Sequence, residues 1–83
     1  MSKQVKSIAG CNLPSGERLG LRRVDDRVGP TLISTQLELH RGETVLATGL
    51  IGIETELHTL GLAADAEEWM LGHLREAVKV VRR

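Results

Sequence analysis

The sequence predicts an α+β fold in which a three- or four-stranded antiparallel sheet, connected as a meander, carries one C-terminal helix packed on one face. Three observations lead to this prediction. Residues 31–53 read as two strands on either side of a glycine-containing turn, the first alternating between apolar and polar residues and the second apolar on both faces. A second alternating segment precedes them at residues 17–24. An apolar stripe at helical spacing follows near the C-terminal end.

The length and composition predict a single small domain over residues 1–83, because 83 residues of which 41% are hydrophobic support one modest core. Within it we expect an N-terminal arm or edge strand at residues 1–16. The meander follows at 17–53 and the helix at 65–82.

The first strand of the central hairpin alternates cleanly, with Ile33, Leu37 and Leu39 on one face. We predict that His40-Arg41-Gly42 forms a three-residue loop with the glycine in the left-handed conformation. That loop places Leu37 opposite Val45. A two-residue loop of Arg41 and Gly42 is the alternative, and it would exchange the two faces of the second strand.

The second strand of the hairpin, predicted over residues 44–53, is apolar on both faces. Val45, Ala47 and Ile51 lie on one face, and Leu46 and Leu50 lie on the other. A strand that is apolar on both sides needs cover on both sides, and the sequence offers one convincing helix. We therefore expect an uncovered sheet face that binds a second copy of the chain or another protein. The alternative is that the N-terminal arm or residues 54–64 fold back over this face.

Two other segments are harder to place. Residues 25–30 combine charge, glycine and proline, and they are expected to interrupt the strand that begins at residue 17. Residues 54–64 fit either a continuation of the second hairpin strand or a connector that tucks leucines under the helix. The sequence does not choose between these two interpretations.

The helix has a start signal and an apolar face. Asp65 is a suitable N-cap, and Glu68 three positions later completes a capping box. We expect Ile33, Leu37 and Leu39 to pack against this face, together with leucines 19 and 21 of the neighbouring strand. The apolar face comprises Met70, Leu71, Leu74, Ala77, Val78 and Val81.

Trp69 borders this apolar stripe and is either a lid on the edge of the core or an anchor for a partner. His73 shares its side of the helix. The residues predicted to form an interface are Leu32, Val45, Leu46, Leu50, Ile51, Trp69 and His73.

Nucleic-acid binding is the alternative function. Eleven basic residues balance eleven acidic ones, so the formal net charge is zero and no overall field attracts nucleic acid or membranes. Phenylalanine and tyrosine are absent, which removes the usual stacking surfaces. A local basic stripe could still contact phosphates from a three-stranded sheet. It would comprise Arg18, Arg22, Arg23, Arg27 and Arg41.

The sequence indicates no catalytic, cofactor or metal site. Cys11 is the only cysteine and lacks the surroundings of a cysteine nucleophile. The spacing of Glu54, Glu56 and His58 is not a strong metal motif. A lone cysteine favours a reducing compartment, and no segment has the length of a signal or a membrane span. We therefore expect a cytoplasmic chain that does not enter membranes.

These observations predict a small non-catalytic binding module that acts through protein–protein contacts. We expect the chain to form a homodimer. We also expect it to act as a regulator or inhibitor of a larger protein machine, like the small inhibitors that phages and mobile elements make.

Overall fold

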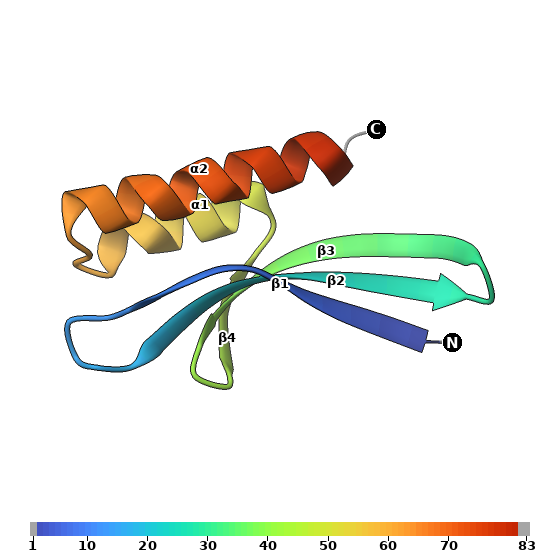
Figure 1. Ribbon diagram of the computed structural model, residues 1–83, viewed down its shortest axis with the longest axis horizontal. Helices are drawn as coiled ribbons and strands as arrows, with labels where there is room; N and C mark the ends of the chain where they lie inside the picture. The colour runs from blue at the N-terminus through green and yellow to red at the C-terminus, as the bar shows by residue number, and fades with distance from the viewer. Residues whose placement is uncertain (1, 82–83) are drawn as a thin grey trace.

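The computed structural model describes residues 2–81, with side chains as far as residue 79. An antiparallel meander in the order β1-β2-β3-β4 comprises β1 (Ser2–Asn12), β2 (Arg18–Val28), β3 (Thr31–Arg41) and β4 (Thr44–Thr48). Two helices, α1 (Leu50–Thr59) and α2 (Ala64–Val81), follow and lie on one side of the sheet (Figure 1). The predicted α+β class is therefore confirmed, and so is a C-terminal helix that packs on the sheet. Helix α1 was not predicted.

The core lies between this side of the sheet and the two helices. Leu37 and Leu39 are buried there as predicted, whereas Ile33 is 60% exposed, so its predicted place in the core is wrong. Val78 is half-buried against the core, and the predicted contact of Val81 lies outside the described side chains. The buried apolar residues are Ala9, Leu13, Leu19, Leu21, Leu37, Leu39, Ile53, Leu57, Met70, Leu71 and Leu74.

Strand β2 does not stop at its charged residues. It continues to Val28, and the turn consists of Gly29 and Pro30, with Gly29 at a φ of 58°. The predicted interruption over residues 25–28 is therefore wrong. Pairing on both sides explains the difference, because Asp25 lies opposite Gln4 of β1 and Thr35 of β3.

The β3–β4 turn differs from both predicted loops. Arg41 pairs with Thr44, so the loop consists of Gly42 and Glu43, with Gly42 at a φ of 60°. Glycine at the first position of a two-residue loop is typical of a type II′ turn. The predicted register is wrong as a result, since Leu37 does not lie opposite Val45. In the structure His40 lies opposite Val45.

Strand β4 ends at Thr48, and the prediction that it runs to Ile53 is wrong. Gly49, at a φ of 76°, turns the chain into α1. Leu50, Ile53 and Leu57 have the spacing of one helical face, and Ile53 and Leu57 are fully buried. Residues 54–59 are helical, so the predicted strand continuation is wrong. The connector interpretation is confirmed in its placement of the leucines, since Leu57 is buried and Leu60 and Leu62 pack against the core. The apolar residues that follow β4 are therefore buried by a second helix, α1, and do not form an uncovered strand face.

Helix α2 begins at Ala64, one residue before the predicted cap. Asp65 lies inside the first turn, where its Oδ1 accepts a hydrogen bond of 2.9 Å from the Ala66 N–H. The N-cap position is therefore Ala63, two residues before the predicted Asp65, which is within the usual uncertainty of helix ends. The apolar stripe is confirmed at Met70, Leu71 and Leu74, which are buried.

The opposite side of the sheet, called the open face below, carries mainly polar residues. Because side chains alternate along a strand, the burial of Leu21 and Leu39 toward the helices puts Arg22, Glu38 and His40 on the open face. The strongly apolar open face expected from the sequence is not observed there.

Candidate functional site

The sheet is longer than the helical layer that covers it. Figure 1 shows the β2–β3 hairpin extending past the last turn of α2 along the 41 Å axis of the molecule. We call this part, formed by residues 2–7, 22–28 and 31–36, the distal sheet. All side chains of residues 2–7 are exposed, as are those of residues 31–34. The distal sheet thus contributes no residue to the buried core, although Lys6 and Arg23 line a cavity against α2.

Large apolar side chains are exposed on the distal sheet. Ile33 and Val5 are each 60% exposed, and Val28 and Leu32 are 49% and 43% exposed. Val5 pairs with Val24 across β1 and β2. The four exposed residues come from all three strands, and Val5 lies on the open face with Val24 and Arg22, because side chains alternate along β2.

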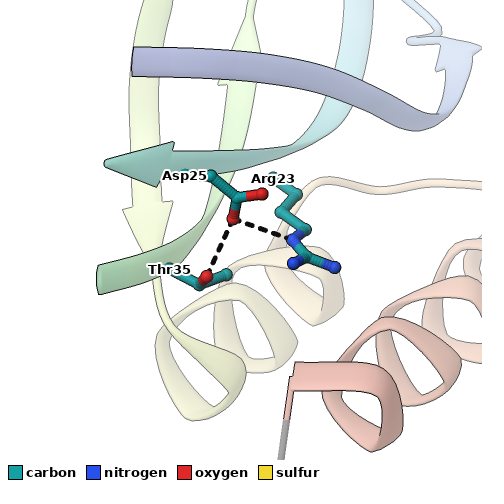
Figure 2. A network of polar contacts seen from close by, with 3 residues as sticks. All are labelled: Arg23, Asp25 and Thr35. Atoms are coloured by element: carbon teal, nitrogen blue, oxygen red, sulfur yellow. Dashed lines mark hydrogen bonds and ion pairs between the residues drawn. The ribbon is translucent and has the colours of Figure 1, made fainter. Parts of the chain in front are cut away.

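A polar network holds the distal sheet together on the side that faces the helices (Figure 2). Asp25 Oδ1 accepts one hydrogen bond of 2.9 Å from Arg23 Nε and another of 2.8 Å from Thr35 Oγ1. These two hydrogen bonds, Arg23 first, lower the pKa of Asp25 below its ordinary value. The network links β2 to β3 on the side of the sheet that faces the helices. Where the helices cover the sheet, leucines occupy the corresponding positions of these two strands.

The predicted interface residues are spread over four elements. Leu32 on β3, Val45 on β4, Ile51 on α1 and Trp69 on α2 are exposed, from 43% at Leu32 to 79% at Ile51. Leu46 and Leu50 are half-buried against the core.

Among the predicted interface residues, Trp69 and His73 are in direct contact. Their ring centroids lie 4.5 Å apart in an edge-to-face arrangement. The tryptophan is 48% exposed, so it does not close off the core in the described chain. This pair and Leu32 of the distal sheet lie on separate elements.

The predicted arginine stripe is divided between the two sides of the sheet. Arg22 lies on the open face, whereas Arg23 faces the helices and pairs with Asp25. Arg27 Nη1 donates to the Pro30 carbonyl over 3.3 Å, and Arg41 Nε lies 3.6 Å from Glu17 Oε2. Arg18 shares the open face with Arg22, and its Nη2 lies 2.9 Å from where a Cβ on Gly10 would stand. The sheet therefore presents two of the five arginines together.

His40 and Glu38 form a pair on the open face that the sequence pattern did not indicate. His40 is 7% exposed, and its Nε2 lies 2.8 Å from Glu38 Oε1. Its Nδ1 is buried without a hydrogen-bond partner among the described residues, as is Asp26 Oδ1. No accessible space adjoins His40 Nδ1, so a ligand could not reach this atom in the described conformation.

Residues 2–81 contain no group of three or more His, Cys, Asp or Glu side chains placed to hold a metal ion. Cys11 is half-buried, and burial raises the pKa of its thiol despite the nearby charge of Arg18. A shallow cavity of about 260 Å³ lies between the sheet and α2, lined by Lys6, Ile8, Arg23, His73, Glu76 and Ala77.

Comparison with protein families, curated proteins and solved structures finds no match to this chain. Within residues 2–81, neither helix combines the length and apolar character that crossing a membrane requires.

Proposed function

We propose that the chain is a small non-catalytic protein-interaction module and that the distal sheet is its binding surface. The observation that carries this proposal is the exposure of Val5, Val28, Leu32 and Ile33 on three strands that extend beyond the helices. Burying one such side chain fully contributes about 1.5–3 kcal/mol. A partner that covers several of them would therefore gain substantial binding energy.

The way in which the distal sheet is stabilised supports the same proposal. A sheet with no layer packed on it gains little from its apolar side chains, and isolated strands are marginally stable in water. The Arg23–Asp25–Thr35 network provides polar support in place of a packed layer. The module thus keeps its apolar residues available while the strands stay in register.

A role as a regulator or inhibitor that occupies a surface of a larger protein fits this size and architecture. A single cysteine suits a reducing compartment such as the cytoplasm.

Site-specific photocrosslinking in cells tests the proposal. A photoreactive amino acid replaces Ile33 in one variant and Thr55, exposed on α1, in the matched control. We expect discrete protein adducts from position 33 and none from position 55. Equal labelling from both positions, or none from position 33, would contradict the proposal.

Nucleic-acid binding is a second candidate, supported by the shared location of Arg18 and Arg22 on the open face. If these arginines neutralise phosphates, binding to duplex DNA weakens as salt concentration rises. The change Arg22→Ala should then reduce both the affinity and the salt dependence, whereas Arg75→Ala on α2 should not. Absence of binding at low salt would remove this candidate.

A further inference from the structure

A small cavity lies between the sheet and α2, and the proposed protein-interaction role does not use it. It has a volume of about 260 Å³ and is formed by residues of β1, β2 and the C-terminal half of α2. Ile8 of β1 and Ala77 of α2 give it an apolar wall, and both side chains also pack against the core. A volume close to the lower end of the range for ligand pockets suits a small organic molecule.

Two basic side chains on the sheet side of the cavity lie directly opposite each other. Lys6 of β1 pairs with Arg23 of β2, so both side chains leave the sheet on the side that faces the helices. Like charges at directly opposed positions destabilise a sheet. Within the described chain, no acidic side chain forms an ion pair with Lys6. An anion bound between these two side chains would offset their repulsion.

Arg23 is held in place by a contact that leaves part of its guanidinium unused. Its Nε donates a hydrogen bond of 2.9 Å to Asp25 Oδ1, which also accepts one of 2.8 Å from Thr35 Oγ1. In Figure 2 the contact with Asp25 runs from Nε, and neither terminal nitrogen of Arg23 takes part in it. The arginine side chain is 24% exposed, so water and salt screen an ion pair there only in part. A guanidinium oriented in this way suits the planar fork of a carboxylate.

The acidic residues near the cavity favour an anion that carries a single charge. Asp25 and Glu76 offset the two basic side chains, so a second negative charge on a ligand would gain little. The Glu76 side chain is 73% exposed, and its Oε2 lies 3.7 Å from Lys79 Nζ. An exposed pair of this kind has little energetic weight, because solvent screens both charges. The cavity therefore combines a site for one carboxylate with an apolar wall.

We propose that this cavity binds a small organic anion with one carboxylate group and a short apolar chain. Arg23 holds the carboxylate through its terminal nitrogens, and Lys6 adds a second positive charge. Ile8 and Ala77 cover the apolar chain. This role goes beyond the proposed protein-interaction function, because the cavity lies against α2, whereas the proposed partner surface consists of exposed apolar residues of the distal sheet.

Titration with isovalerate, followed through amide chemical shifts in two-dimensional NMR spectra at constant ionic strength, tests the binding site. Saturable shifts should occur at residues 6–8, 23 and 76–77. For a ligand of about seven non-hydrogen atoms, we expect a dissociation constant on the order of millimolar. Two related compounds should each bind at least about tenfold more weakly. Isovaleramide keeps the shape but lacks the charge, and acetate lacks the apolar chain.

Three variants make opposite predictions for the same ligand. Arg23→Gln should weaken isovalerate binding by about tenfold or more, and Lys6→Gln by about threefold, because each removes a positive charge. Glu76→Gln removes a nearby negative charge and should strengthen binding by about twofold. The matched control is Lys3→Gln, at an exposed lysine of β1 that pairs with Asp26 on the open face. This variant should bind isovalerate like wild type.

Circular dichroism should show that each variant is folded. Lys6→Gln keeps the test decisive if Arg23→Gln does not fold, because Lys6 is an exposed residue outside the core. Absence of saturable shifts with isovalerate, equal affinity for isovaleramide, or equal affinities of the Lys6→Gln and Lys3→Gln variants would overturn the inference. Its failure is distinct from failure of the protein-interaction proposal, which depends on the adducts formed from position 33.

Discussion

Asp25 shows how a single charged residue can sit within a strand and stabilise it. Its side chain is 14% exposed and is held by Arg23 and Thr35. In the sequence it appears as part of a charged run that should break the strand. Its partners are two and ten residues away, and the hydrogen bond to Thr35 exists only once β2 and β3 pair.

Replacing this carboxylate should lower stability by a modest amount. For Asp25→Asn we expect a loss of about 1 kcal/mol, since the site is partly accessible to solvent and the amide keeps some hydrogen bonding. Chemical denaturation at neutral pH measures it. A matched change, Glu68→Gln on an exposed position of α2, should leave stability nearly unchanged.

The same residue should give stability a pH dependence. The pKa of Asp25 is lower in the folded chain than its ordinary value of 3.8, so the ionised carboxylate favours folding. This contribution is fully present above pH 3.8 and is lost as the pH falls through the lowered folded-state pKa. Asp25→Asn should reduce this acid-side slope in a pH series of denaturation curves. An unchanged slope would assign it to other carboxylates.

At the scale of elements, the transition from β4 to α1 decides where the apolar residues go. The run from Val45 to Ile53 contains a strand pattern and a helical pattern at once. Gly49 separates them, because its positive φ ends the strand and redirects the chain. With α1 formed, Ile53 and Leu57 join the core that α2 shares.

Two alanine substitutions should therefore have opposite effects on α1. Gly49→Ala should destabilise the fold by about 1 kcal/mol or more, because alanine adopts a positive φ at a cost. Gly52→Ala lies inside α1, where its Cβ would meet the Ala47 Cβ at an ordinary 3.8 Å, and should stabilise by about 0.5–1 kcal/mol. Thermal unfolding of the two variants measures both. Equal effects would contradict the assigned boundary.

Helix α2 should contribute most through its buried face. Leu74 is fully buried between the sheet and the helices, so Leu74→Ala should destabilise by about 2–5 kcal/mol. Ile51→Ala, at a side chain 79% exposed, should change stability by about 0.5 kcal/mol or less. Urea denaturation compares the two variants. A small effect at Leu74 would mean that α2 is not packed as described.

At the scale of the whole molecule, stability should vary along the long axis. The core lies between the helices and the near end of the sheet, whereas the distal sheet contributes no side chain to the buried core. Regions with few buried contacts open at low free energy. The molecule therefore combines a stable end with an end that should open more readily.

Hydrogen exchange should reveal this gradient and its response to association. Amides of residues 22–28 should exchange faster than those of residues 18–21 in a dilute sample, although both belong to β2. Raising the protein concentration should slow exchange in the distal sheet if a second copy of the chain covers it. Uniform exchange along β2 would contradict the gradient.

The sequence by itself determined the α+β class, the β3 alternation and the apolar stripe of α2, because these patterns repeat over long enough runs to have one interpretation. The tertiary structure alone decided that residues 50–59 are helical, that β2 passes through its charged residues, and which part of the sheet stays uncovered. It also divided the arginines between two faces and left Ile33 in solvent. Short apolar or charged runs fit several local structures, and the choice among them depends on partners distant in the chain.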